Sequence, residues 1–255
     1  MTGPVLSVSG LTRDFGAVRA VDSVSLDIRR KSITGLIGPN GAGKTTLFNM
    51  VAGALKPTQG TVTLNGADVT GLSSDALFAR GLARTFQIPR PFRRMSVLDN
   101  VLLAPPKQTG ETVVGALFRQ ARVAAEEARI RDKARAMLDF VTLGALADQP
   151  AGKISGGQMK LLELARALMG DPDVILLDEP AAGVNPSLAR ILVERIEELN
   201  RRGMTFVIIE HDMDFVMRHC DPVIALAEGR IVFQGTVAEA QADPLLLDAY
   251  LGTAA

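Results

Sequence analysis

A glycine-rich segment at residues 38–46 constrains this chain more than any other part of its sequence. It satisfies the pattern G-x-x-x-x-G-K-[ST], which cradles phosphate groups. Glycines let successive backbone N–H groups close around phosphate oxygens, and the start of the following helix adds partial positive charge. An apolar run at 33–37 precedes the loop, and a helical pattern at 46–55 follows it. This strand–loop–helix context predicts that the segment binds a nucleotide.

Every residue of the loop is expected to contact the nucleotide. In such loops the lysine, here Lys44, reaches the β- and γ-phosphates, and the hydroxyl of Thr45 binds Mg²⁺. The predicted ATP-binding residues are Gly38, Pro39, Asn40, Gly41, Ala42, Gly43, Lys44, Thr45 and Thr46. The simpler alternative is a glycine-rich turn that carries Lys and Thr by chance, and the flanking strand and helix argue against it.

Charge balance and cysteine content restrict the partners and the compartment. The 255 residues include 28 basic and 28 acidic side chains, so no general attraction to nucleic acid is expected. The sequence does not exclude a local basic patch. The single cysteine, Cys220, excludes an internal disulfide and suits a reducing cytosol. We see no signal peptide and no run approaching the ~18 apolar residues of a membrane helix. At a membrane, such a chain would act through partners.

Hydrophobic patterning predicts an α/β core with some antiparallel sheet. Residues 5–28 alternate as strands do, and Asn65-Gly66 is a strong hairpin signal. After residue 157 the expected elements are helices at 160–169 and 188–202, buried strands at 174–177 and 205–209, and a hairpin at 225–232. We therefore expect a single domain, 1–255, whose end at about 236–255 forms a tail.

The stretch from about 88 to 160 interrupts this core and is predicted to be mainly helical. Its longest helical segment has an apolar face formed by Val123, Ile130, Met137, Leu138 and Val141. The charged residues between 126 and 135 are interpreted as the solvent-exposed face of that helix.

An acidic pair, Asp178-Glu179, follows the buried-strand run. A strand that ends in Asp can hold the Mg²⁺ side of a phosphate-loop site, and Glu179 can orient or deprotonate the attacking water. Because Lys44 and Asp178 are far apart in sequence, they must meet through neighbouring strands. Alone, the pair is better interpreted as a turn before Pro180, but the phosphate loop favours the catalytic interpretation.

A second glycine-containing segment, Ser155-Gly156-Gly157-Gln158, also leads into a helix. Free N–H groups, a hydroxyl and a helix N-terminus suit phosphate binding here too. One small domain rarely needs two such ends for one nucleotide, so we expect this segment to face ATP held by a second subunit. Taken alone, Ser155 would be interpreted as a helix N-cap.

These motifs together resemble the ATP-binding subunits of ABC transporters, essentially from end to end. Residues 38–46 match the family's Walker A loop, residues 175–179 its Walker B strand, and residues 154–158 its signature motif, with Ile154 where Leu is usual. The resemblance implies a P-loop NTPase (RecA-like) α/β core with an N-terminal antiparallel β-subdomain and an inserted α-helical subdomain. It also implies ATP as substrate and Mg²⁺ as cofactor.

Four further positions match the family residue by residue. Gln87 matches the Q-loop glutamine, which touches Mg²⁺ or the attacking water, and His211 matches the switch histidine at the γ-phosphate. Phe15 lies where the family stacks an aromatic ring on adenine, although a core aromatic is the alternative. Asn185 lies in the D-loop, where many members have Asp. The implied catalytic set is Glu179, His211, Gln87 and Lys44, and the implied Mg²⁺ ligands are Thr45, Gln87 and Asp178.

Narrower similarities point to the branched-chain amino acid importer group. These similarities lie in four segments, at residues 83–101, 180–186, 210–213 and 248–252. The resemblance implies a second ATPase subunit, identical or paralogous, two transmembrane permease subunits, and indirectly a periplasmic or extracellular solute-binding protein. No nucleic-acid partner is expected. The location would be peripheral, on the cytoplasmic face of a bacterial or archaeal membrane.

Two other classes share parts of this pattern. A non-transport ABC ATPase of DNA repair would generally carry a very long coiled-coil insertion, and a ribosome-associated one usually has two such cores. A phosphate-loop GTPase or small-molecule kinase would not carry the segment at 154–158, and no N-K-x-D motif is found. Import of branched-chain amino acids or a related small polar solute is therefore the favoured function.

Overall fold

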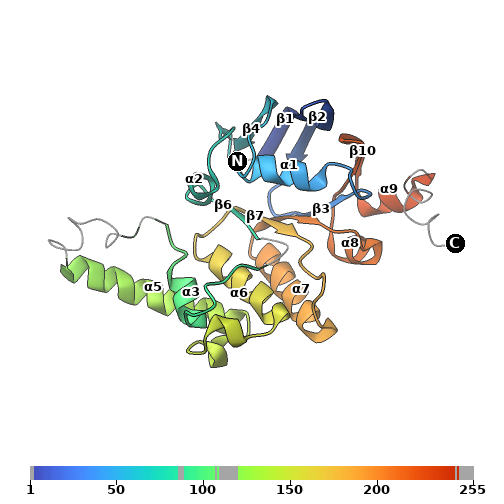
Figure 1. The fold of residues 1–255 in the computed structure, drawn as a ribbon. Helices are drawn as coiled ribbons and strands as arrows, with labels where there is room; N and C mark the ends of the chain where they lie inside the picture. The colour runs from blue at the N-terminus through green and yellow to red at the C-terminus, as the bar shows by residue number, and fades with distance from the viewer. Residues whose placement is uncertain (1–2, 86–88, 107, 109–119, 245, 247–255) are drawn as a thin grey trace.

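The computed structural model describes residues 3–85, 89–106, 108, 120–244 and 246. Two sheets and the helices around them form the fold (Figure 1). Within the described residues, no helix combines the length and the apolar character needed to cross a membrane.

A mostly parallel sheet forms the centre of the described residues. Its strand order is β10 (Arg230–Gly235), β9 (Val223–Ala227), β3 (Ile33–Ile37), β8 (Thr205–Ile209), β7 (Val174–Asp178) and β6 (Leu82–Arg84). Strands β3, β7 and β8 are buried at every residue, which explains their uninterrupted apolar runs. The expected strands at 33–37, 174–177 and 205–209 are confirmed.

A second, antiparallel sheet contains the N-terminal strands. Its order is β2 (Val18–Ile28), β1 (Leu6–Phe15), β4 (Gln59–Leu64) and β5 (Ala67–Asp68). Both expected hairpins form: Asn65 and Gly66 have φ of 53° and 81°, and Glu228 and Gly229 have φ of 48° and 77°. Left-handed residues at both central positions suit the twist of a two-residue hairpin.

Helix α1 (Lys44–Val51) lies between the two sheets (Figure 1). Alternate side chains of the central strands face it, because successive residues of a strand point to opposite faces. Leu36, Leu176 and Val207 belong to the core cluster that contains Leu47 and Phe48 of α1. The helix begins two residues before the expected start at 46 and ends before the expected end at 55.

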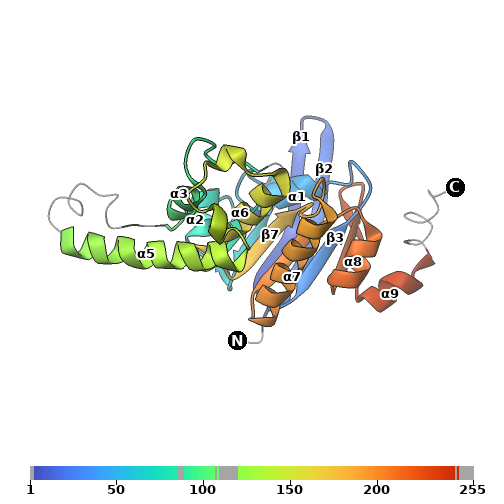
Figure 2. The same cartoon turned by 90° about the horizontal axis from the view of Figure 1, so that it is seen from below.

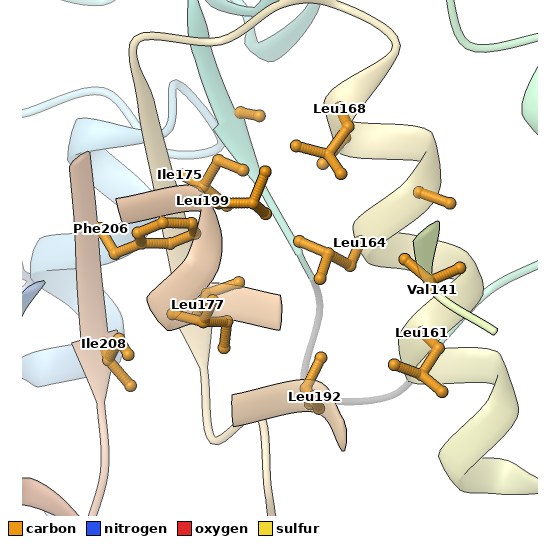
Figure 3. Packing of buried hydrophobic residues seen from close by; sticks show 14 of the residues in the cluster. Val141, Leu161, Leu164, Leu168, Ile175, Leu177, Leu192, Leu199, Phe206 and Ile208 are labelled. Carbon is orange, nitrogen blue, oxygen red and sulfur yellow. The ribbon is translucent and has the colours of Figure 1, made fainter. Parts of the chain in front are cut away.

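The opposite face of the central sheet is covered by α6 (Gly156–Leu168) and α7 (Pro186–Arg201). Figure 3 shows Leu161 and Leu164 of α6 on the side that faces Leu177 and Phe206 of the sheet. Both expected helices are therefore present. Both pack against the side chains of the central strands that point away from α1.

The described part of the chain between β6 and α6 is mainly helical. It contains α3 (Val97–Leu102), α5 (Gln120–Phe140) and short 3₁₀ turns at Gly144–Leu146 and Ala151–Lys153. Helix α5 projects from the body of the molecule (Figures 1 and 2). Ile130, Ala134 and Leu138 are buried, while most charged residues from 126 to 135 are exposed, as the pattern predicts.

Several short elements were not anticipated from the sequence. They are β6, α2 (Ser74–Phe78), α3, α8 (Met213–His219) and α9 (Val237–Ala242). Each has seven residues or fewer, which is too short for a hydrophobic period to be distinguished from chance.

Leu164→Ala tests the packing between α6 and the sheet. Leu164 is 1% exposed, so we expect the cavity to lower the free energy of unfolding by about 2–5 kcal/mol, measured by chemical denaturation. Leu103→Ala, at a side chain that is 52% exposed, is the matched control and should change it far less. Equal effects of the two variants would contradict this packing.

Candidate functional site

The site is built at one edge of the central sheet, where three parallel strands end. The phosphate loop leaves β3, Glu179 follows β7, and His211 follows β8 by two residues. Leu36 and Asp178 both pair with Ile209, so the three strand ends are in register. Strands β3 and β7 do not pair with each other, because β8 lies between them.

The loop between β3 and α1 adopts a conformation that requires glycine. Gly43, the N-cap of α1, has φ of 97°. A Cβ atom there would lie 2.4 Å from the carbonyl oxygen of Ala20 in β2. The N–H of Gly229 donates to the carbonyl of Ala42 at 3.0 Å. The loop is thus held against β2 and the β9–β10 turn, and its glycines allow this close approach.

Lys44 is held by the loop it belongs to. Its Nζ donates to the carbonyl oxygens of Gly38 at 2.6 Å and Pro39 at 3.0 Å. Partial burial lowers the pKa of Lys44, and the negative charges of Glu179 and Asp178 act in the opposite direction. The structure therefore brings the lysine and the acidic pair into one electrostatic environment, as the sequence predicts. The neighbouring Thr45 is exposed.

Asp178 is buried at the end of β7 and has a cationic partner. Arg84 Nη2 lies 3.2 Å from Asp178 Oδ2, and Arg84 Nη1 donates to Asn49 Oδ1 of α1 at 2.5 Å. Asp178 is only 6% exposed, so this charge-assisted contact compensates its desolvation. A carboxylate here and the hydroxyl of Thr45 are hard oxygen donors, which fit Mg²⁺.

Glu179 adopts an unusual backbone conformation beside His211. Its φ is 47°, a left-handed value that is disfavoured for a residue with a Cβ atom. Its side chain is 24% exposed, and Oε1 lies 3.6 Å from Nδ1 of His211, whose side chain is 64% exposed. Buried Glu210 lies 3.9 Å from the same nitrogen through Oε2. A carboxylate and an imidazole that reach solvent together can orient water.

The segment from Ser155 to Gln158 forms the N-terminus of α6. The Ser155 hydroxyl accepts from the N–H of Gln158 at 3.3 Å, and Gln158 Oε1 accepts from the N–H of Ser155 at 2.8 Å, which is a capping box. Ile154 before it is 6% exposed and anchors the segment in the core. Among the described residues, the segment makes no hydrogen bond to the loop at 38–46.

Phe15 and Asn185 lie near the surface. Phe15 is 47% exposed at the end of β1, with the Arg13 guanidinium 4.7 Å from its ring centroid. This exposure rules out the alternative of a core aromatic. Asn185 caps α7, and its Oδ1 accepts from the N–H of Ser187 at 2.9 Å. Gln87 falls outside the described residues, and its role stays a prediction.

His219 and Cys220, interpreted from the sequence as structural, make local contacts. Nδ1 of His219 lies 2.8 Å from Oε1 of Glu197. Burial raises the pKa of the Cys220 thiol to about 12, which suits a packing role.

Three charged residues of the site were not assigned from the sequence: Arg84, Lys160 and Glu210. Lys160 Nζ donates to the carbonyl oxygens of Glu179 and Ala182, at 2.7 and 2.8 Å. A signal for Lys160 was available, because it precedes Leu164 by four residues and so lies on a face of α6 that packs in the core. No comparable signal marks Arg84 or Glu210.

Gly43→Ala tests the geometry of the loop, with Gly66→Ala as its matched control. Residue 66 has a similar φ of 81° but open space around the added Cβ, so its variant should lose about 1–2 kcal/mol and keep ATP binding. At residue 43 the added Cβ meets Ala20, so we expect loss of ATP binding by calorimetry. Unchanged binding in the Gly43 variant would contradict the assigned geometry.

Comparisons with known proteins identify the family of this chain. A family model described as "ABC transporter" matches residues 21–182. A probable branched-chain amino acid transport ATP-binding protein LivG from Archaeoglobus fulgidus is 38% identical over 248 residues, which cover 97% of this chain and 95% of that protein. The high-affinity branched-chain amino acid transport ATP-binding protein LivG from Salmonella typhimurium is 39% identical over the full length of both chains.

Solved structures show the same fold. A nucleotide-free ATP-binding cassette from an ABC transporter superposes with a TM-score of 0.82 at 37% identity, covering 96% of this chain and 98% of that one. The ADP conformation of an ATP-binding cassette of an ABC transporter gives 0.83 at 37% identity, covering 98% and 100%. This chain belongs to the ABC transporter family, as an ATP-binding subunit that hydrolyses ATP.

Proposed function

We propose that this chain powers an importer for branched-chain amino acids or a related small polar solute. The observation that carries the proposal is the set of groups gathered at one sheet edge: a phosphate loop with Lys44, the carboxylate of Asp178, and Glu179 beside His211. The solute class rests on the names of relatives that align along the full chain.

The chemistry assigned to Lys44, Glu179, Asp178 and His211 combines their place at that edge with the family resemblance, and the roles of Gln87 and Phe15 rest on the resemblance. Lys44 and the loop N–H groups bind the phosphates and stabilise charge that develops on the γ-phosphate. Glu179 orients or deprotonates the attacking water, and His211 and Gln87 contact the γ-phosphate or that water. Mg²⁺, held by Thr45, Asp178 and Gln87, would neutralise phosphate charge. Phe15 offers its exposed ring to adenine.

The second phosphate-binding end suggests that two ATPase subunits act together. The capped N-terminus of α6 is exposed at Ser155 and Gly156, and Gln158 is partly exposed. These residues and Gly157 would contact ATP bound to the partner's loop, and Asn185 would lie at the interface between the two subunits. Two ATP molecules would then be enclosed head to tail between identical or paralogous subunits.

Transport requires that closure of this pair moves membrane partners. We assign that contact to the helical subdomain at about 88–160, from which α5 projects (Figure 2). A hollow of about 280 Å³, lined by Thr85, Leu103 and Arg166 among others, lies between that subdomain and the core. Two permease subunits, served by a solute-binding protein, would hold this chain at the cytoplasmic face of the membrane. The tail at about 236–255 would complete the single domain.

Glu179→Gln tests the hydrolytic role. The amide keeps the shape of the side chain but cannot accept a proton, so ATP hydrolysis should fall about 10²–10⁴-fold while ATP binding persists. Glu194→Gln, at an exposed carboxylate of α7, is the control and should behave as wild type. Near-normal turnover by the Glu179 variant would remove Glu179 from the mechanism.

The solute is tested on the assembled transporter. The chain is co-purified with its permease subunits, and ATPase activity is measured with the solute-binding protein and leucine, urea or an aromatic acid. We expect leucine to stimulate hydrolysis the most. Stimulation by urea or an aromatic acid alone would reassign the solute, and failure to co-purify with any membrane protein would contradict a transport function.

A further inference from the structure

The backbone that carries Glu179 has to be held in place by its surroundings. A left-handed φ of 47° at a residue with a Cβ atom persists only where neighbouring groups over-determine it. The N–H of Glu179 donates to the carbonyl of Ile209 at 3.0 Å, and its own carbonyl accepts from the N–H of Ala182 at 3.2 Å. The first bond ties the turn to β8, and the second closes the turn on itself.

Lys160 links this turn to α6. Its Nζ donates to the carbonyl of Glu179 at 2.7 Å and to that of Ala182 at 2.8 Å, at both ends of the turn. On the other side, the N–H of Ala181 lies 3.5 Å from Oε1 of buried Glu210. The turn at 179–182 is therefore clamped between an ammonium and a carboxylate.

Lys160 connects the turn at 179–182 to the N-terminus of α6, because it lies in the first turns of that helix. Lys160 is two residues after Gln158, which closes the capping box with Ser155 at the exposed start of the helix. One turn further on, Oε1 of Glu163 accepts from the N–H of Arg90 at 3.2 Å. The first turns of α6 are thus tied to the catalytic turn and to the start of the helical insertion.

The charge of Lys160 also fits its surroundings. Burial lowers its pKa, and the negative charges of Glu210, Glu179, Glu163 and Asp178 act in the opposite direction. A half-buried ammonium among carboxylates, with two donors on backbone carbonyls, is compensated in both charge and hydrogen bonding.

We propose that Lys160 is a positioning residue for hydrolysis, which sets the backbone of Glu179 according to the position of the α6 N-terminus. The inference rests on the proposed function, because it assumes that Glu179 acts on water and that Ser155 to Gln158 meet the partner's ATP. Binding of that ATP would then be communicated through Lys160 to the catalytic turn of the same chain.

The test compares Lys160→Met, Lys160→Arg and wild type in the full chain assembled with its partner subunits. Methionine keeps the length but donates no hydrogen bond, so we expect kcat to fall about 10- to 100-fold, because a slightly misplaced catalytic group costs this much. The KM for ATP should change less than about twofold, because the loop at 38–46 is untouched. Arginine keeps the charge and donors and should restore most of kcat.

Lys133→Met is the matched control. Lys133 also donates to a backbone carbonyl, that of Met169 at 3.1 Å, and pairs with Asp171, but none of these residues belongs to the catalytic set. Its variant should keep the wild-type kcat, with thermal unfolding monitored for every variant. If Lys160→Met does not fold, Lys160→Leu, which likewise donates no hydrogen bond, takes its place with the same expected loss of kcat.

The possible outcomes separate the two proposals. Wild-type protein that hydrolyses ATP, with an unchanged kcat in the Lys160→Met variant, would overturn the role of Lys160 alone. A loss of kcat that arginine does not restore, or that Lys133→Met shares, would overturn it as well. Wild-type protein without ATPase activity would instead refute the proposed function.

Discussion

The parallel pairing of β3, β8 and β7 is the constraint on which the rest of the structure depends. Parallel strands place their carboxyl ends at the same edge of a sheet, and ligand sites of open α/β sheets form there. Lys44, Asp178 and His211 reach that edge from three strands that are distant in sequence. Apolar packing on both faces fixes the register, so the core determines the spacing of the groups that we propose act in hydrolysis.

Charge compensation then stabilises this edge. Buried or half-buried charges are costly unless they are paired and hydrogen-bonded. Lys44 is satisfied by two carbonyls of its own loop, Asp178 by Arg84, and Lys160 by the carbonyls of Glu179 and Ala182. The contacts of Lys44 lie within the phosphate loop, whereas those of Lys160 join α6 to the turn at 179–182.

Most of the fold could be predicted because its long elements have clear periods and its loops have specific turn residues. The buried strands, α5, α6, α7 and the hairpin at Asn65-Gly66 were all predictable in this way. Elements as short as β6 carry no detectable period. The contacts of Lys160 were not predictable, because its partners are backbone carbonyls whose positions depend on the tertiary fold. The residue alone does not predict the exposure of Phe15, since an aromatic residue at a strand end suits a core or a surface equally, and only the family resemblance favoured the exposed position.

The central claim is that the loop at 38–46 is half of a composite ATP site, which we propose is completed by residues 155–158 of another subunit. The most direct measurement is specific ATPase activity against concentration, down to dilutions at which sedimentation shows monomers. The purified chain is used, together with its paralogous ATPase if the pair is heteromeric. Activity per chain is predicted to fall towards zero as subunits separate. Constant activity per chain in the fully monomeric protein would contradict the claim.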